Sequence, residues 1–267
     1  MSKKVAVIIP FYKDDLSQYE SIALEQCFKV LGGHTIIAIK PERLILPDSV
    51  TKYPFSSTVS FNDSFFAGVQ GYNRLMLSAE FYSAFIDYEF VLIHQLDAFV
   101  FKDDLLDWCN RGFDYIGAPW IQPHPFPDLI KTVKSKIQYY LHTRFNVLED
   151  GIPSTKQFEY KVGNGGFSLR RTKIFHEICL KQADKILEYT GHQHHRYNED
   201  AFWSIEVNRK RKILSIPNYK TGVRFAFEFY PNHALKINHG QLPFGCHAWD
   251  LQLDFWRPVF KEQGYEI

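Results

Sequence analysis

A polar interruption in an apolar segment is the feature that most constrains this chain. Residues 90–93 read Phe-Val-Leu-Ile, and His94, Gln95 and Asp97 follow before the chain becomes apolar again. A continuous apolar run is typical of a strand buried on both faces of a mostly parallel sheet. Ligands of open α/β sheets bind at the carboxyl ends of such strands. Asp97 is therefore placed to meet a divalent cation that carries a diphosphate, unless it only caps a turn.

The first part of the chain alternates predicted strands and helices. The expected elements are strands at 5–10, 34–40 and 58–61, and helices at 18–31 and 72–86. Ser17 and Glu20 form a capping box that marks the start of the first helix. The strand-helix-strand order predicts a parallel pair with a right-handed crossover. Neither G-x-G-x-x-G nor G-x-x-x-x-G-K-[ST] occurs in the sequence, which disfavours a dinucleotide fold and a P-loop.

The second part of the chain is predicted to be mixed. The expected elements are strands at 114–120, 167–170, 213–216 and 224–229, helices at 128–145, 172–189 and from 198, and loops at 121–127 and 149–158. No internal repeat and no change in composition divides the chain, so the sequence favours a single α/β domain.

The predicted helix at 128–145 is amphipathic and basic. Its apolar face holds Leu129, Val133, Ile137, Tyr140, Leu141 and Phe145, and its polar side holds Lys131, Lys134, Lys136 and Arg144. The apolar face is expected to pack against the core. The basic side either is a solvated surface or touches an anionic lipid-linked or polymeric molecule.

Composition and charge argue against several classes of protein. With 31 basic and 30 acidic side chains the net charge is +1, which gives no electrostatic reason to expect nucleic-acid binding. The four cysteines form no C-x-x-C pair, so neither structural zinc nor a disulfide framework is predicted. No apolar stretch approaches the ~18 residues of a membrane span, and the N-terminal run is too short for a signal peptide. The expectation is a soluble, cytoplasmic protein.

Three further clusters carry candidate chemistry. Residues 163–166 read Gly-Asn-Gly-Gly, which either lets the backbone approach a ligand or forms a tight turn. Asn198 is a predicted N-cap, and Glu199 and Asp200 follow in the first helical turn, where a carboxylate either acts as a general base or only stabilises the helix. His247 lies in a Pro-Gly loop, either as a metal ligand or as a core residue.

Other histidine and hydrolase signals are weaker. The cluster at 192–195 (His-Gln-His-His) lacks a helical i, i+4 pair and a neighbouring cysteine, so zinc binding is disfavoured against a mobile, partly protonated loop. His239 is an alternative to His247 as a ligand from the C-terminal part of the chain. No G-x-S-x-G elbow occurs, so serine hydrolase chemistry has no support.

Taken together and in chain order, these segments resemble a glycosyltransferase of the GT-A type. The corresponding segments are 5–12 for the first strand and nucleotide-contacting loop, 92–100 for the strand with the D-x-D motif, 163–170 for the N-G-G motif, 198–200 for the E-D motif of inverting members, and 243–249 for a C-terminal His motif. A closer resemblance is to an uncharacterised bacterial family assigned to the glycosyltransferases, through residues 115–120, 198–200 and 243–247. It spans about residues 4–250.

The resemblance implies a single GT-A (Rossmann-like) domain over 1–267, with a mixed, mostly parallel sheet flanked by helices. It implies a donor-binding half at about 1–120 and an acceptor and catalytic half at about 121–267. Asp200 is the implied general base, with Glu199 beside it. The implied donor contacts are Pro10, Tyr12, Gln95, Asp97, Asn164, Gly165 and Gly166.

One departure from the family pattern concerns the metal. In Gln95-Leu96-Asp97, a glutamine stands where D-x-D has its first acid. Mn²⁺ or Mg²⁺ prefers charged oxygen ligands, so the metal either is held weakly by Asp97 and His247 or is absent.

The implied activity is transfer of a sugar from a nucleotide-sugar donor to a glycan, a lipid-linked molecule or another hydroxyl acceptor. Such transfer is expected to invert the anomeric centre in one step, with retention as the alternative, and to serve polysaccharide biosynthesis. Peripheral contact with the inner face of the membrane is a further expectation, through the basic helix at 128–145. The alternatives are a non-catalytic glycan- or nucleotide-binding domain of the same fold, and a nucleotidyltransferase.

Overall fold

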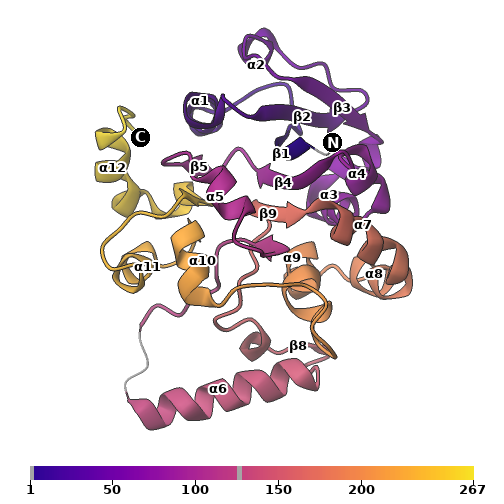
Figure 1. Cartoon of the computed structure of the whole chain (residues 1–267), viewed down its shortest axis with the longest axis vertical. Coiled ribbons are helices and arrows are strands. Elements are labelled where there is room, and N and C mark those ends of the chain that lie inside the picture. The colour runs from indigo at the N-terminus through magenta and orange to yellow at the C-terminus, as the bar shows by residue number, and fades with distance from the viewer. Residues whose placement is uncertain (1–2, 125–127) are drawn as a thin grey trace.

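The computed structural model describes residues 3–124 and 128–267. Within these residues the central sheet has six strands in the order β3–β2–β1–β4–β9–β6. The strands are β1 (Lys3–Pro10), β2 (Thr35–Pro41), β3 (Ser57–Phe61), β4 (Tyr88–His94), β6 (Tyr115–Ile116) and β9 (Phe167–Arg171). The first four are mutually parallel, and β9 runs antiparallel between β4 and β6. The predicted mixed, mostly parallel sheet is confirmed (Figure 1).

Helices cover both faces of this sheet. The α-helices of the described residues are α1 (Gln18–Leu31), α2 (Asp48–Thr51), α3 (Gly68–Met76), α4 (Ala79–Ala84), α5 (Leu105–Cys109), α6 (Leu129–Arg144), α7 (Thr172–Lys181), α8 (Ala183–Thr190), α9 (Glu199–Ala201), α10 (Tyr219–Phe225), α11 (Pro231–Ile237) and α12 (Leu253–Glu262). In β1, Ala6 and Ile8 pack toward α3, α4 and α7, whereas Val7 and Ile9 pack toward α1 and α5. Burial on both faces explains why the strands are apolar throughout. In the described ranges no helix has the length and hydropathy that crossing a bilayer requires.

Two predicted helices are interrupted. The helix expected at 72–86 is divided into α3 and α4, because the hydroxyl of Ser78 accepts a hydrogen bond from the Phe81 N–H (3.1 Å) and starts a new helix. The helix expected at 172–189 is divided into α7 and α8 at Gln182, whose backbone leaves the helical region. Helical spacing alone did not reveal either break, because the apolar pattern continues across both.

One predicted strand is wrong, and another is reduced to two residues. Residues 213–216 are irregular, because side chains satisfy their backbone: Asn208 Oδ1 accepts from the N–H groups of Ile213 (2.7 Å) and Leu214 (2.9 Å). The strand expected at 224–229 is instead the end of α10 followed by the two-residue strand β10 (Ala226–Phe227).

A small second sheet joins distant parts of the chain. Its order is β10–β11–β5, with β5 at Phe99–Val100 and β11 at Gly245–Cys246. Strand β5 begins two residues after Asp97, and β11 directly precedes His247. Their antiparallel pairing therefore brings together two residues that lie far apart in the sequence.

Helix α6 begins as predicted but packs the other way round. It lies at one edge of the molecule (Figure 1), next to the 3₁₀ turn η2 (Thr155–Gln157) that follows the β7–β8 hairpin (Leu148–Glu149 and Ile152–Pro153). Ile137 and Phe145, which were expected in the core, are exposed. The predicted loop at 121–127 is irregular over 121–124, and residues 125–127 lie outside the described residues.

Candidate active site

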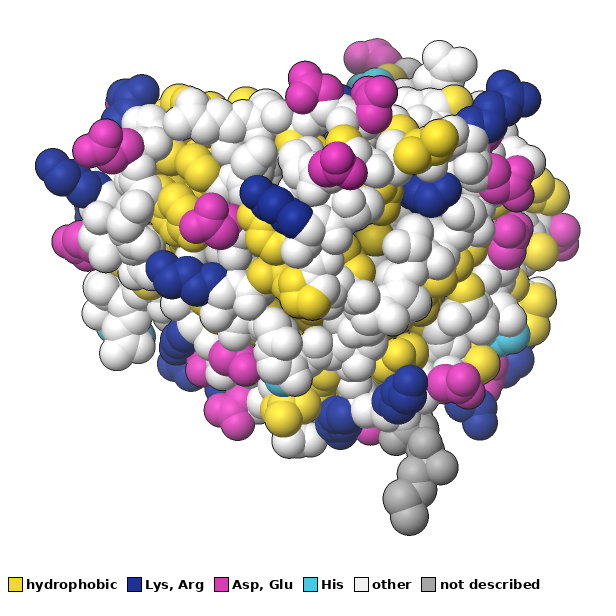
Figure 2. All heavy atoms as spheres, turned by 90° about the horizontal axis from the view of Figure 1, so that it is seen from above, with side chains coloured by type: hydrophobic (Ala, Val, Ile, Leu, Met, Phe, Trp, Pro, Cys, Tyr) yellow, Lys and Arg dark blue, Asp and Glu magenta, His cyan; other side chains and the backbone are white. Residues whose placement is uncertain are grey.

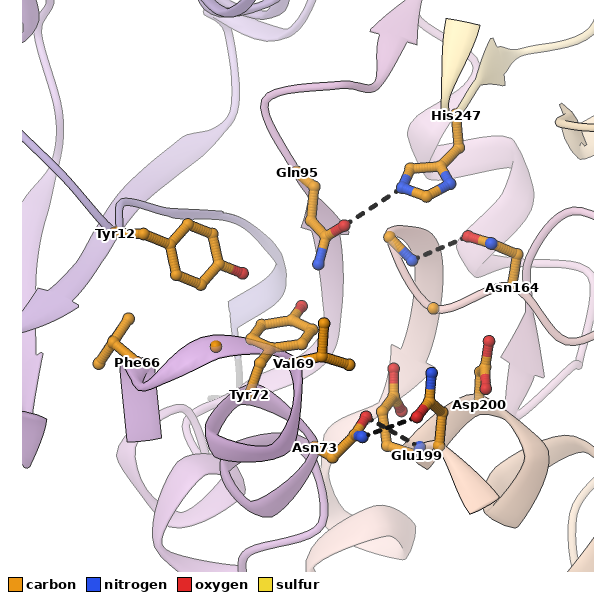
Figure 3. A pocket seen from close by; sticks show the side chains of 14 residues that line it. Tyr12, Phe66, Val69, Tyr72, Asn73, Gln95, Asn164, Glu199, Asp200 and His247 are labelled. Carbon is orange, nitrogen blue, oxygen red and sulfur yellow. Dashed lines mark hydrogen bonds between the residues drawn. The ribbon is translucent and has the colours of Figure 1, made fainter. Parts of the chain in front are cut away.

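A cavity of about 610 Å³ opens where the parallel strands β1 and β4 end. Eight of the predicted site residues line it, namely Tyr12, Gln95, Asn164, Gly165, Gly166, Glu199, Asp200 and His247 (Figure 3). Pro10 is instead buried in β1, opposite Ile39 of β2. Asp97 lines an adjoining hollow of about 320 Å³, whose wall shares Tyr12 and Gln95 with the first cavity.

A second cavity of about 620 Å³ adjoins the first. Asn164, Asn198 and Asp200 line both of them. The second cavity also has aromatic walls, formed by Trp120, Phe158, Phe229 and Tyr230. Apolar and aromatic walls with a few convergent polar groups are typical of sites for small organic ligands. Two adjoining cavities with a shared wall can hold two reactants.

Three polar side-chain atoms, one each from His247, Asp97 and Gln95, lie close together where the first cavity meets the hollow. His247 Nε2 lies 3.1 Å from Asp97 Oδ1 and 3.2 Å from Gln95 Oε1. Burial favours the neutral ring, but Asp97 and Glu228 raise the pKa of His247 to about 10. Burial likewise opposes ionisation of Asp97, yet His247 holds the pKa of that carboxyl below its usual value. Both groups are therefore charged at neutral pH and form an ion pair.

Glu228 is a buried acid of the site that the sequence analysis missed. Its Oε1 accepts a hydrogen bond from Asn164 Nδ2 and lies 3.6 Å from His247 Nδ1. Asn164 Oδ1 in turn accepts from the Gly166 N–H (2.9 Å), so Asn164 connects the glycine loop to Glu228. The available signal was that Glu228 interrupts an apolar run, as Asp97 does.

The glycines of the 163–166 loop make room for neighbouring side chains. A Cβ at Gly165 would collide with Glu199 Oε1, and a Cβ at Gly166 would collide with the His247 ring and approach Gln95 Oε1 to 2.6 Å. None of these glycines is among the described residues with positive φ. In the structure the groups that approach this loop are side chains of the protein itself, and approach to a ligand stays a prediction.

Arg170 is a core residue that supports the site from below. Its fully buried guanidinium makes a 3.0 Å ion pair with Glu199 and hydrogen bonds to Ser168 Oγ, the Tyr82 hydroxyl and the Gly165 carbonyl. Burial opposes the charge of Arg170, but Glu199 raises its pKa. Burial also raises the pKa of Glu199, an effect that Arg170 counteracts. The sequence signal was a charged residue on the inward face of a strand.

Asp200 differs from its neighbour in having no cationic partner among the ion pairs of the described residues. It lines both cavities, and its Oδ1 accepts from the Ala201 N–H (2.7 Å). Burial and the adjacent charge of Glu199 raise the pKa of Asp200 well above its usual value. A carboxylate with a raised pKa that faces a cavity suits proton transfer.

Asn198 precedes α9 as predicted, but its side chain makes no capping hydrogen bond. Asn73 of α3 supplies the cap from outside, because its Oδ1 accepts from the Glu199 N–H (3.2 Å) and its Nδ2 donates to Asn198 Oδ1 (2.9 Å). The start of α9 is therefore fixed by another helix, as Figure 3 shows. A single-sequence pattern cannot reveal such a long-range cap.

Aromatic rings form the opposite wall of the first cavity. Tyr12 makes edge contacts with Phe66 (5.8 Å between centroids) and Tyr72 (5.9 Å). Figure 3 shows these rings across the cavity from His247. Tyr12, predicted to contact the nucleotide, therefore shares this wall with Phe66 of η1 (Asp63–Phe66) and Tyr72 of α3. The sequence analysis suggested neither of these two residues.

The remaining histidine candidates lie elsewhere. His94 is buried beside the Phe167 ring, and burial lowers its pKa to about 4, so it is a neutral core residue. His192 stacks on Tyr197, and His195 lines the second cavity. Across 3–124 and 128–267 there is no group of three or more His, Cys, Asp or Glu side chains arranged to hold a metal ion.

Solved structures with a similar arrangement are glycosyltransferases. A crystal structure of galactosyltransferase LgtC in complex with donor and acceptor sugar analogs is 12% identical, with a TM-score of 0.51. A crystal structure of an active-site mutant of LgtC is 16% identical, with a TM-score of 0.53. Each match covers 91% of this chain and 86% of that chain. At this identity the match shows the fold, which is the GT-A glycosyltransferase fold.

The sequence itself also matches a family. The profile of the family described as "Protein of unknown function (DUF5672)" matches residues 56–247, and the chain belongs to this family. No curated protein matches the sequence. A bacterial distribution of the family stays a prediction.

The Arg170–Glu199 pair gives a first testable expectation. Arg170→Met should lower the free energy of unfolding by ~3–5 kcal/mol, because it leaves a buried carboxylate without its counter-charge. The double variant Arg170→Met, Glu199→Met should recover most of this loss, since no buried charge remains. Urea unfolding of the three proteins measures the difference. A single variant as stable as the wild type would show that the pair is not what holds α9 against β9.

Proposed function

We propose that this protein is a glycosyltransferase that moves a sugar from a nucleotide-sugar donor to a hydroxyl acceptor. The observation that carries the proposal is Asp200, an acid with a raised pKa in the wall shared by two cavities. The GT-A fold supports the same conclusion. The first cavity would hold the donor and the second the acceptor.

The donor assignment follows from the two ends of the first cavity. The Tyr12, Phe66 and Tyr72 rings offer an apolar surface for a nucleotide base, and Gln95 and His247 lie at the other end. Without a bound metal, the charged His247 would offset the negative charge of a leaving diphosphate. Lining residues come from both the proposed donor half (1–120) and the proposed acceptor half (121–267).

The residues around His247 fit a divalent metal. Adjacent ligands of an octahedral ion with bonds of ~2.1 Å are about 3 Å apart. The spacings from His247 Nε2 to Asp97 Oδ1 (3.1 Å) and to Gln95 Oε1 (3.2 Å) match this geometry. Asp97 and His247, assisted by Gln95, would therefore hold Mn²⁺ or Mg²⁺. When bound, the metal would neutralise charge on the diphosphate.

The proposed chemistry is a direct displacement. Asp200 takes the proton of the acceptor hydroxyl while that oxygen forms a bond to the anomeric carbon. The bond from this carbon to the diphosphate oxygen breaks, and the nucleoside diphosphate leaves with the electron pair. Attack and departure on opposite faces invert the anomeric centre. The anomeric configuration of the product, read by NMR, tests this step.

A non-catalytic binding domain is the second candidate. Because Gln95 replaces an acid, Asp97 is the one negatively charged group among the three side chains that would hold the metal, Gln95, Asp97 and His247. Such a site could bind a nucleotide sugar without transferring it. Thermal shift with a panel of sugar nucleotides detects binding in either case, because a ligand of the native state raises stability. Release of free nucleotide then distinguishes the enzyme from the binder.

The general base is tested by substitution. Asp200→Asn should reduce turnover roughly 10²- to 10⁴-fold and leave donor affinity near the wild-type value, because the amide keeps the shape and loses the basicity. Glu199→Gln is the comparison variant: it should lower stability, because Arg170 loses its counter-charge, but the folded protein should retain much more turnover. Rates come from nucleotide release and affinities from calorimetry. If Glu199→Gln loses turnover while Asp200→Asn retains it, the roles are reversed.

The pH dependence follows from the raised pKa of Asp200. The active form is the carboxylate, so kcat/KM should fall as pH decreases through this raised pKa, well above the range of an exposed aspartate. Glu199→Gln and, to a smaller extent, Glu228→Gln remove neighbouring negative charges and should move this acidic limb to lower pH. If the pH at which kcat/KM falls is the same in both variants and the wild type, the titrating group is not Asp200.

The metal and diphosphate site is tested at Asp97 and Gln95. Asp97→Ala should weaken donor binding at least tenfold, about 1.4 kcal/mol. Gln95→Asp should tighten Mn²⁺ binding, because it restores a charged oxygen ligand. Metal must displace the proton of His247, so affinity should increase with pH. Titration calorimetry measures all three effects. Full activity after exhaustive chelation would contradict the metal assignment.

A further inference from the structure

Helix α6 exposes its apolar face. We call the six residues Ile130, Val133, Ile137, Tyr140, Leu141 and Phe145 the α6 stripe. Their exposed fractions are 70%, 56%, 55%, 64%, 42% and 72%, respectively. At ~100° per residue these side chains lie within an arc of roughly 140°, and the exposed Lys134 and Arg144 fall within the same arc, so they form one apolar face that two cations interrupt. The helix has 16 residues and is therefore about 24 Å long.

The outward orientation is fixed by the polar face of the helix. His142 Nδ1 lies 2.7 Å from Ser154 Oγ, and Thr143 Oγ1 donates to the Gln157 carbonyl (3.4 Å). Arg209 also donates to the Thr143 carbonyl. Rotating α6 to bury its apolar face would break these contacts. The structure thus holds an amphipathic helix with His142 and Thr143 facing inward and its apolar and basic side chains exposed, the reverse of the usual packing.

The charges within α6 are of one sign, although the N-cap Asp128 lies 4.0 Å from Lys131 Nζ. Residues 129–144 contain Lys131, Lys134, Lys136 and Arg144 but no Asp or Glu. The nearest acids in the sequence, such as Asp128 and Glu149, lie beyond the ends of the helix. By contrast, Figure 2 views the molecule from the end opposite α6, and there basic and acidic side chains are interspersed. A bulky apolar face bordered by cations is typical of helices that lie in the interface of an anionic membrane.

We propose that the α6 stripe binds the surface of an anionic lipid bilayer. The apolar side chains would enter the headgroup region, and the long lysine and arginine side chains would reach the lipid phosphates. A second copy of this chain fits less well as the occupant. A two-fold interface places the same patch against itself, so the four cations of one helix would face those of the other with no acid on either helix to pair with them.

Vesicle co-sedimentation of the full chain tests the proposal. The chain should sediment with phosphatidylcholine vesicles that contain about 30% phosphatidylglycerol. It should sediment much less with vesicles of pure phosphatidylcholine. Replacing Lys131, Lys134 and Lys136 by Gln should weaken binding on the order of 100-fold, at roughly fivefold per cation. Ile137→Glu should weaken it at least tenfold by placing a charge in the interface. Because Ile137 is exposed, this variant should fold normally, which circular dichroism checks.

A matched control lies on α8. Leu187 is 69% exposed, and Leu187→Glu should leave vesicle binding unchanged. The four native cysteines are buried, so Ile137→Cys and Leu187→Cys can be labelled selectively with an environment-sensitive dye. Only the dye at 137 should shift to the blue with anionic vesicles. Vesicle binding equal in wild type and Ile137→Glu would overturn the proposal. The absence of vesicle binding would also overturn it. In that case light scattering would show whether the stripe is instead a dimer interface that Ile137→Glu disrupts.

Discussion

The ion pair between Arg170 and Glu199 is the interaction on which the rest of the site depends. Arg170 belongs to β9, Glu199 starts α9, and the remaining N–H groups of the guanidinium reach Ser168, Tyr82 and the Gly165 carbonyl. One cation thus fixes a strand, a loop and a helix relative to one another. Burying two charges is costly unless their hydrogen bonds are satisfied: each nitrogen of the guanidinium donates a hydrogen bond, whereas Glu199 Oε2 has no partner among the described residues. Because Glu199 takes the ion pair, the next residue, Asp200, is left facing the two cavities.

The glycine loop connects this pair to the second charged cluster. Without side chains at Gly165 and Gly166, the Glu199 carboxylate and the His247 ring can both lie against the same short segment. Asn164 adds the link to Glu228, which lies 3.6 Å from His247. The acidic pair of α9 and the Asp97–His247 pair are therefore positioned by one loop. This explains why a small part of the sequence determines the geometry of the cavity.

The sequence predicted the elements and residues that depend on local patterns. It did not predict features that depend on contacts between residues far apart in the chain. Strands β1, β2, β4 and β9 follow from apolar runs, the mixed sheet follows from the family resemblance, and most site residues follow from their position after a strand or in a turn. Asn73 as the cap of α9 and Arg170 as the partner of Glu199 are long-range contacts, which a single sequence does not display. The break at Ser78 was hidden by a continuous apolar pattern. For α6 the periodicity gave the correct face but not the direction in which it points.

The position of α6 connects the proposed membrane contact to the proposed acceptor cavity. The helix rests on the segment that contains Gln157, and Thr155, Phe158 and Glu159 of the same segment line the second cavity. A bilayer that held the α6 stripe would therefore lie close to the acceptor side of the molecule. Confinement to one surface raises the effective concentration of a membrane-anchored acceptor without any new contact in the cavity. The basic helix would then select acceptors by where they are anchored, whereas the aromatic walls around Asp200 would select them by their sugar.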